Sequence, residues 1–493
     1  MNNTRGSKVL TNSIVYSIGG LITKGFAFFL LPLYTAYLTP ADYGITSIVT
    51  TFLSISGFIV SFSLFASVLR FYVDYKDTPE SLRVFYGTTF IFITVAGLFF
   101  WILLYLLRDV LSYYIFAGID FYPIVCVCLI SMVFNCTHTF FETILRSQQK
   151  AMKATILSVA YFLLNAGFTI LLVVFFDMGA LGVVLATLIA GFSYTIYMLL
   201  DMIFHGTIAF RFDGSILKES LKYSIPIIPH NISPHLALLV EKVLISGRCS
   251  LAVLGIYSVA AQFGSLADTV QIYVNQAYGP WLFEKIKENK GPSQEIRNIS
   301  KLLAAVIGGI FLIISIFAHD YIILFIDPQY VDAWMYVPLI VIVYTIKTTY
   351  YFYVNILFYY KKAARILFLA TLAGSLSSVC LAFCLIPQIG ANGAIVADGI
   401  AMIIQVALVI YISKKFDDIG LKLRDFISNI IMVSSFVFIG LLPSFLYFGH
   451  EFNLANMAYK ILITILYCIV VFYQYRKKIQ AIVYQVKNKL IKQ

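Results

Sequence analysis

The sequence predicts an all-α integral membrane protein with about 14 transmembrane helices. Of its 493 residues, 60% are apolar and only 12% are charged, and the mean hydropathy is +0.89. Soluble domains carry about 25% charged residues, so a chain of this composition cannot cover a water-facing surface. The apolar residues also gather in runs of about 20 residues or more, which is the length that a helix needs to span a bilayer.

Charge clusters and proline or glycine turns separate these runs and set the expected helix boundaries. In chain order the runs cover 11–38, 44–69, 84–107, 121–145, 152–176, 178–204, 221–246, 251–280, 300–326, 333–360, 364–387, 391–413, 426–448 and 455–475.

Several boundaries carry information of their own. The first run follows Arg5 and Lys8, but it is too long for the core of a signal peptide and is expected to stay in the protein. Only Asp177 separates the fifth run from the sixth, next to Gly179. Three prolines between 226 and 234 remove backbone donors from the seventh run, which is therefore expected to bend.

Lysine and arginine in the connections predict the orientation. On one side of the membrane 29 of them collect, whereas the other side has only Arg108 and Arg248. This split predicts that both termini are cytoplasmic and that 477–493 is a basic cytoplasmic tail. Because topology explains the net charge of +11, a nucleic acid partner is not expected.

Metal, cofactor and nucleotide chemistry are not expected either. The sequence has no G-x-x-x-x-G-K-[S/T] phosphate loop, which excludes nucleotide hydrolysis by that route. Six of the seven cysteines lie inside apolar runs, as small buried hydrophobes do. Cys126, Cys128, Cys136 and His138 match no zinc-ligand spacing.

An internal repeat relates the two halves of the chain at an offset of 211 residues. It pairs Tyr43–Ser47 with Leu254–Ser258 and Gly179–Gly182 with Gly390–Gly393, and it superimposes the first six runs on the next six. Since each unit has an even number of spans, the repeat is parallel, as in transporters that open alternately to the two sides. The predicted domains are a six-helix lobe at 1–205, a second lobe at 221–415, two additional helices at 426–476 and the tail.

Four ionisable residues lie deep in the expected spans. Counted at 1.5 Å per residue, Lys24, His235, Asp268 and Lys347 lie roughly 18 to 21 Å from the inner helix ends. A charge at this depth costs about 2.5 to 3.5 kcal/mol on insertion scales, so it is expected to face a cavity or a partner. Lys24 and His235 are also 211 residues apart, so they occupy equivalent positions in the two repeats, and we call such residues repeat mates.

These residues lead to a list of candidate site residues. The candidates for binding an anionic substrate are Lys24, His235, Asn231, Lys347, Asn275 and Arg70, and those for ion coupling are Asp268 and Asp398.

Three alternatives stand beside this list. The first run carries Ser13, Ser17, Gly20, Lys24 and Thr35 on one helix face. Such stripes of Ser, Thr and Gly are commonly packing surfaces in membranes. Lys347 has the alternative of a structural ion pair with Asp268 or Asp398. Glu241 and Lys242 are expected to extend to the outer surface of the membrane.

Several short motifs resemble those of the polysaccharide biosynthesis (Wzx-type) flippases in the multidrug/oligosaccharidyl-lipid/polysaccharide exporter superfamily. They are Leu38–Gly44 (LTPADYG), Arg70–Phe71, Arg146–Lys150 (RSQQK) and the Gly-x-x-Gly pairs Gly179/Gly182 and Gly390/Gly393. The resemblance implies a multi-pass protein of the bacterial cytoplasmic membrane with a two-lobed helix bundle. It also implies movement of an undecaprenyl-diphosphate-linked oligosaccharide from the inner to the outer leaflet, without enzymatic chemistry.

The partners that follow are the lipid-linked oligosaccharide, membrane lipids, a coupling proton or sodium ion, and other polysaccharide assembly proteins. The two additional helices resemble the peptidoglycan-precursor flippase branch, which often carries arginines in its cavity where this chain has Lys24 and His235. A small-molecule or drug antiporter is a second rival. A glycan polymerase or ligase is the enzyme alternative, although such enzymes usually need a larger outer loop than any connection here.

Overall fold

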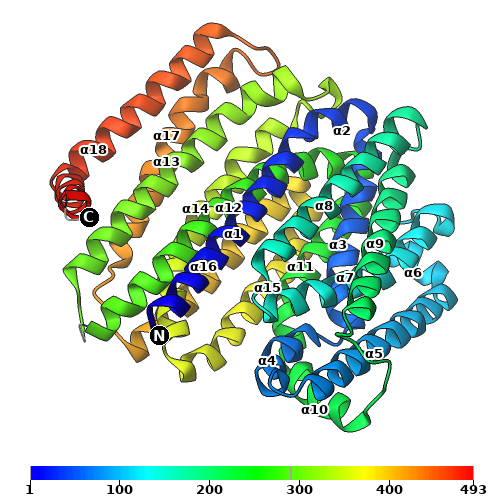
Figure 1. Ribbon diagram of the computed structural model, residues 1–493. Coiled ribbons are helices and arrows are strands. Elements are labelled where there is room, and N and C mark those ends of the chain that lie inside the picture. Colours follow the sequence, from blue (N-terminus) through cyan, green and yellow to red (C-terminus); the bar gives the residue numbers. More distant parts are fainter. Residues whose placement is uncertain (1, 289–290, 492–493) are drawn as a thin grey trace. The chain divides into compact units, whose positions relative to one another are not determined.

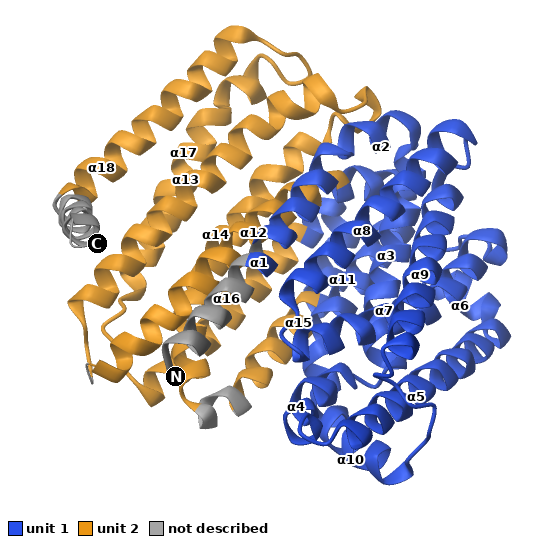
Figure 2. Cartoon of the chain, viewed as in Figure 1, with its two compact units in different colours: residues 1–258, 379–394 blue, residues 259–378, 395–493 orange. Residues whose placement is uncertain are grey.

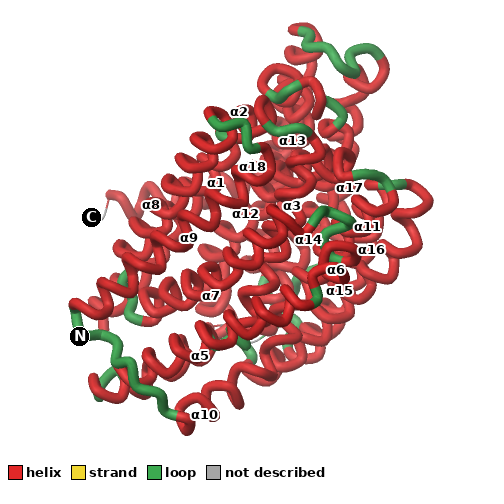
Figure 3. The backbone as a smooth tube through the Cα atoms, turned by 90° about the vertical axis from the view of Figure 1, so that its right-hand side faces the viewer, coloured by secondary structure: helices red, strands yellow, loops and turns green. Residues whose placement is uncertain are grey.

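The structure, a computed structural model, describes residues 2–288 and 291–491, without the side chains of 2–14, 17, 361–365 and 477–491. Arg5, Lys8 and the side chains of the basic tail therefore lie outside the description. Every regular element in the described ranges is a helix (Figure 3). Thirteen segments among the described residues are long and apolar enough to cross a membrane, which confirms the predicted all-α membrane class.

The chain forms two compact units (Figure 2). Unit 1 comprises residues 1–258 and 379–394, and unit 2 comprises 259–378 and 395–493. The units cut across the repeat, because the first turns of the eighth run belong to unit 1. The division into lobes at 1–205 and 221–415 stays a prediction about the repeat.

Unit 1 contains the helices up to the first turns of α12 (Figure 1). They are α1 (Asn2–Phe29), α2 (Leu31–Tyr37), α3 (Pro40–Val60), α4 (Phe65–Tyr75), α5 (Pro79–Leu106), α6 (Arg108–Tyr114), η1 (Phe121–Val125), α7 (Cys126–Ser147), α8 (Ala151–Ile170), η2 (Leu171–Phe175), α9 (Gly179–Phe204), α10 (Gly214–Ser224), η3 (Ile225–Ile227) and α11 (Ile228–Arg248). Within this unit α7 packs against α3, α5 and α9, and α11 packs along α3.

Unit 2 is built around α13. Its elements are most of α12 (Leu251–Glu288), α13 (Gln294–Phe325), η4 (Pro328–Tyr330), α14 (Ala333–Tyr359), most of α15 (Lys361–Ile389) and α16 (Ala391–Phe416), α17 (Leu423–Leu446) and α18 (Leu454–Ile491). The two additional helices, α17 and α18, pack on α13 through a buried apolar cluster that includes Leu312, Val437 and Tyr467.

The motif Leu38–Gly44 builds the start of α3. Thr39 is the N-cap, and Pro40 occupies the first helical turn, where its missing N–H costs nothing. Asp42 completes a capping box, because its Oδ2 accepts from Thr39 N (3.2 Å) and from Thr39 Oγ1 (2.6 Å). Its other oxygen accepts from Ala180 N (3.2 Å) at the start of α9. One carboxylate thus caps one helix and holds the beginning of another.

The second predicted run, 44–69, is interrupted. Helix α3 ends at Val60, and Phe62 and Ser63 adopt left-handed backbone conformations with φ of 49° and 52°. Residues with side chains rarely adopt these angles, and the chain leaves the helix there before α4 begins. The expected single span is therefore α3 followed by a separate short helix.

The seventh predicted run, 221–246, is a further difference. It forms the end of α10, the 3₁₀ turn η3 and α11, and this segment is absent from the 13 candidate spans in the described chain. The prolines and five polar or charged residues interrupt the apolar sequence of α11: His230, Asn231, His235, Glu241 and Lys242. Although α11 is not among the candidate spans, it packs along α3, and these contacts hold it in place.

Candidate functional site

A ladder of polar side chains joins α12 to α14 inside unit 2. Its first step is the ion pair of Asp268 and Lys347, whose Oδ1 and Nζ atoms lie 2.8 Å apart. Tyr351 Oη donates a weaker hydrogen bond of 3.4 Å to the same carboxylate oxygen, and Lys347 Nζ lies 5.2 Å from the centre of the Tyr344 ring. Both charged side chains are about one quarter exposed, so the pair is accessible from outside the unit.

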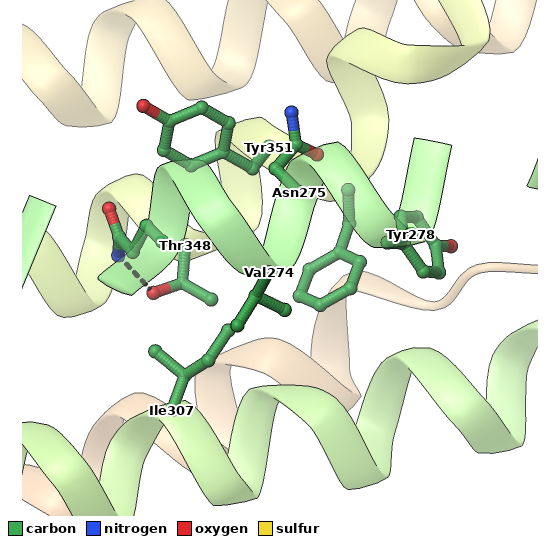
Figure 4. A pocket seen from close by; sticks show the side chains of 8 residues that line it. Val274, Asn275, Tyr278, Ile307, Thr348 and Tyr351 are labelled. Carbon is green, nitrogen blue, oxygen red and sulfur yellow. Dashed lines mark hydrogen bonds between the residues drawn. The ribbon is translucent and has the colours of Figure 1, made fainter. Parts of the chain in front are cut away.

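The next step of the ladder surrounds a small cavity (Figure 4). Gln271 Nε2 donates to Thr348 Oγ1 and to the Tyr344 carbonyl, both at 2.5 Å. Its Oε1 is buried and has no partner among the described residues. The cavity beside it measures about 10 Å³, which is roughly the room that one water needs. A water there would satisfy the orphaned oxygen.

Asn275 forms the third step. Its Oδ1 accepts from Asn355 Nδ2 at 2.6 Å, one helical turn beyond Tyr351. The structure thus places two predicted substrate residues, Lys347 and Asn275, and one predicted coupling residue, Asp268, on this polar ladder. Asp398 lies elsewhere in unit 2, on α16, where its Oδ1 accepts from Ser378 Oγ of α15 at 2.8 Å. Lys347 therefore pairs with Asp268.

Lys24 lies on the face of α1 that turns away from α8. Helix α1 rests on α8 through Gly19, where an added Cβ would come within 2.4 Å of Thr155 Cγ2, and through the ring contact of Phe26 with Phe162. Lys24 lies roughly 140° around the helix from Gly19 at 100° per residue. Its side chain is exposed and forms no hydrogen bond or ion pair with the described residues.

His235, the repeat mate of Lys24, has a different environment. Its ring stacks on Phe58 of α3 with centroids 5.2 Å apart, and it is half-buried. One turn earlier on α11, the Nδ2 atom of Asn231 is buried without a partner among the described residues, and so is Nδ1 of His230. Buried polar atoms are almost always paired, so these two atoms point to a water or ligand.

The structure also places Arg70, whose predicted role in substrate binding stays a prediction, and corrects one expectation about Glu241 and Lys242. Arg70 lies on α4, beyond the break in the second run, and pairs with Asp74 at 2.9 Å with both side chains about half exposed. The expectation that Glu241 and Lys242 extend to the membrane surface is wrong. Glu241 is 1% exposed and accepts a hydrogen bond from Tyr257 Oη, while Lys242 Nζ donates to Thr51 Oγ1 (2.7 Å). Both side chains turn inward because α3 and α12 offer them polar partners.

The sequence analysis also missed a buried cluster in unit 2. Lys460 of α18 is fully buried, and its Nζ lies 2.7 Å from Asp320 Oδ2 and 3.1 Å from His319 Nδ1 of α13. The other ring nitrogen of His319 bonds the Phe448 carbonyl at 2.9 Å. A search for charges at mid-membrane depth does not reach this cluster, because Lys460 is five residues from the start of its run. The feature of the sequence that could have revealed this cluster is the presence of a lysine, Lys460, inside the apolar run 455–475.

Repeat mates meet directly at the starts of α3 and α12, in the part of α12 that belongs to unit 1. Ser258 Oγ donates to Ser47 Oγ at 2.8 Å, and these serines are 211 residues apart. An added Cβ would lie 2.2 Å from the Leu251 carbonyl oxygen at Gly44 and 1.8 Å from the Pro40 carbonyl oxygen at Gly255. Gly44 and Gly255 are repeat mates as well, so the two backbones cross where only glycine fits.

Comparison with known sequences identifies relatives. A family model described as "Polysaccharide biosynthesis protein" matches residues 9–286. The chain is 24% identical over 361 residues to Lsg locus putative protein 1 of Haemophilus influenzae, an alignment that covers 72% of this chain and 86% of that protein. It is also 24% identical over 374 residues to an uncharacterized membrane protein of the same species, covering 74% of this chain and 87% of that one.

Solved structures share the fold. The lipid II flippase MurJ, in an inward closed conformation, matches with a TM-score of 0.71 at 17% identity and covers 94% of this chain and 100% of its own. An inward-facing multidrug resistance MATE family transporter of the MOP superfamily matches with a TM-score of 0.57 at 15% identity, covering 82% and 97%. At these identities the similarity establishes the architecture, which is that of MurJ and the MATE transporters.

Proposed function

Because the chain belongs to the polysaccharide biosynthesis protein family, we propose that it is a flippase for an undecaprenyl-diphosphate-linked oligosaccharide. It moves this lipid from the inner to the outer leaflet of a bacterial cytoplasmic membrane by alternating access, with both termini in the cytoplasm. The family match to residues 9–286 and the MurJ-like fold support this class of function. Other polysaccharide assembly proteins would supply and remove the substrate.

The observation that carries the proposal is the environment of Lys24. A lysine near the middle of a predicted span costs several kcal/mol if it faces lipid, so its exposed side chain requires water or an anion. A diphosphate supplies that anion, and a lysine holds it as an adjustable point charge. Release on the far side is easier from one lysine than from a bidentate arginine, and this suits a carrier that must let go.

His235 and Asn231 extend this headgroup site in the proposal. Both lie on α11 one turn apart, and the buried Nδ2 of Asn231 is a donor without a partner among the described residues. Sugar hydroxyls and phosphate oxygens are acceptors for such a donor. The ring of His235 is held by Phe58, so its orientation is fixed before the substrate arrives.

We propose that the coupling ion acts at the polar ladder between α12 and α14 in unit 2. Asp268 shares its carboxylate between Lys347 and Tyr351, and protonation of Asp268 or binding of sodium would break the ion pair. Asp398 and His235 are the other candidates for this role. A proton-coupled carrier would lose its dependence on the proton gradient in Asp268→Asn while keeping downhill exchange.

The test of the proposed function is translocation by Lys24→Ala in cells that depend on this protein for glycan export. We expect Lys24→Ala to abolish export at an unchanged protein level in the membrane, and Lys24→Arg to retain part of it. Lys218→Ala is the matched control, because Lys218 is an exposed lysine of α10 that belongs to none of the family motifs. Normal export by Lys24→Ala would refute the role given to this lysine.

The peptidoglycan-precursor flippase remains the second candidate, favoured by the two additional helices α17 and α18. The two substrates share the lipid diphosphate and differ in the sugar. Export measured with each lipid in proteoliposomes separates them, and transport of small cations without either lipid would favour the antiporter. Release of a glycan polymer or a transferred glycan would identify an enzyme.

A further inference from the structure

A polar cavity opens at the start of α17, and none of the residues of the proposed transport site lines it. It measures about 400 Å³. The described residues that line it come from α13, α17 and α18, all in unit 2: Lys301, Arg424, Asp425, Ser428, Asn429, Met432, Gln474 and Tyr475. This size suits a small polar group rather than a single ion.

The cavity carries an excess of positive charge. Asp425 is bound by Arg297, whose Nε and Nη2 atoms lie 2.5 and 3.0 Å from its oxygens, and by Lys301 at 3.3 Å. Arg424 adds another cation, is exposed and has no hydrogen bond or ion pair with the described residues. Two cations, Lys301 and Arg424, thus line the cavity with one carboxylate that Arg297 already binds from outside the lining. The cavity also lies at the N-terminal end of a 24-residue helix, whose dipole favours an anion.

A second observation points to a ligand that also donates a hydrogen bond. Asn429 is 9% exposed, and its Nδ2 donates to the Ala304 carbonyl at 3.0 Å. Its Oδ1 is buried and has no partner among the described residues. An orphaned acceptor in a polar cavity is usually satisfied by a group bound there. A ligand with an anionic centre and a hydroxyl group would meet both requirements.

Exposed apolar side chains stand next to the lining residues on α17 and α18. Ile427 and Ile431 of α17 are 44% and 61% exposed, and Phe472 of α18 is 51% exposed. In the predicted topology this end of α17 lies at the inner leaflet, because Lys301, Lys422 and Arg424 belong to the basic side. A ligand seated here therefore touches the hydrocarbon of the inner leaflet.

We propose that this cavity binds the headgroup of an anionic phospholipid of the inner leaflet, of the phosphatidylglycerol type. The phosphodiester binds Lys301 and Arg424, and a glycerol hydroxyl donates to Asn429 Oδ1. The acyl chains lie along the exposed apolar side chains of α17 and α18. The bound lipid is a fixed partner of the two additional helices and is distinct from the lipid that is transported.

The experiment titrates the purified full chain, in a neutral detergent, with short-chain phosphatidylglycerol and counts the bound lipid by native mass spectrometry. Phosphatidylcholine, inorganic phosphate and undecaprenyl phosphate are the comparison ligands. We expect one phosphatidylglycerol per chain and about fivefold weaker binding in Arg424→Gln, the loss of one cation near a membrane surface. Ser428→Phe, which fills the cavity without changing charge, should weaken binding as well.

Lys422→Gln is the matched control, because Lys422 is an exposed cation two residues before Arg424 that does not line the cavity. Equal binding of phosphatidylcholine and phosphatidylglycerol, or equal loss in Lys422→Gln and Arg424→Gln, would overturn the proposal. Displacement by inorganic phosphate would mean a free-phosphate site, and displacement by undecaprenyl phosphate a site for the transported lipid. Either result refutes it. Lys24→Ala should leave phosphatidylglycerol binding unchanged, which separates this test from that of the transport function.

Discussion

The crossing of α3 and α12 can be tested by adding one methyl group to Gly44. In Gly44→Ala the new Cβ would lie 2.2 Å from the Leu251 carbonyl oxygen, whereas ordinary contacts begin at 3.4 Å. The obstacle is backbone, which cannot rotate away. The two helices must therefore separate by about 1.2 Å at this point.

Over-packing of this kind costs about 1 to 3 kcal/mol. At the middle of that range, about 2 kcal/mol, the population with the crossing closed falls roughly 30-fold relative to the open one. Gly57→Ala provides the matched control on the same helix. Its added Cβ would lie 3.6 Å from Asn135 Nδ2, an ordinary contact, so the same change of residue should leave the crossing intact.

Disulfide formation reports the crossing in membranes. Ser47 and Ser258 have hydroxyls 2.8 Å apart, so cysteines at both positions are close enough for a disulfide to form. The background must lack Cys249, which is exposed. We expect rapid cross-linking of the cysteine pair with Gly57→Ala and strongly slowed cross-linking with Gly44→Ala. Equal rates in the two variants would refute the argument that glycine is required for the close approach.

Two further predictions follow from the described contacts, and one follows from the charge distribution of the sequence. Lys460→Met should lower the stability of the detergent-purified protein by about 3 to 5 kcal/mol, because it removes the lysine that pairs with the buried Asp320. The double variant with Asp320→Asn should recover much of this loss in thermal unfolding, and no recovery would contradict the pairing. An impermeant thiol reagent applied to intact cells should label a cysteine placed at Asp109 but not one placed at Lys287, in a background without Cys249. Labelling of both cysteines would contradict the predicted topology. Hydrogen bonds from Ser215 and Ile216 hold the pKa of Asp213 below its usual range. The ionised carboxylate, as N-cap, therefore stabilises α10 fully at pH values above the usual pKa of an aspartate, and this stabilisation is lost as the pH falls through the lowered pKa. Amide exchange of α10 against pH should show this loss in the native protein and not in Asp213→Asn.

The membrane class and most helices could be predicted because length and hydropathy of a run depend on local sequence alone. The breaks were harder. The first predicted run, 11–38, divides into α1 and α2, and Pro32 was an overlooked sign of this break. Phe62 and Ser63 break the second run without any such sign in the sequence. Their left-handed conformation depends on the packing of α3 and α4, which sequence periodicity does not contain.

The candidate site was predicted in part for a similar reason. Depth along a helix can be counted, and it led to Asp268 and Lys347, which do pair. The direction in which a side chain points from its helix depends on which other helices pack against it. The sequence was less informative about this direction than about depth. Glu241 and Lys242 turn inward because Tyr257 and Thr51 come from other helices to meet them. The roles of Lys24, His235, Asn231 and Arg70 stay predictions.

The two bonds of Asp42 have a consequence for the order in which the chain is made. This carboxylate caps α3 through Thr39, and it also holds Ala180, which lies 138 residues later in the sequence. At a synthesis rate of about 5 to 20 residues per second, roughly 7 to 28 s pass between the two ends of this interaction. During that interval the capping box of α3 can form, but Oδ1 of Asp42 gains the Ala180 amide as a partner only after the start of α9 has been synthesised.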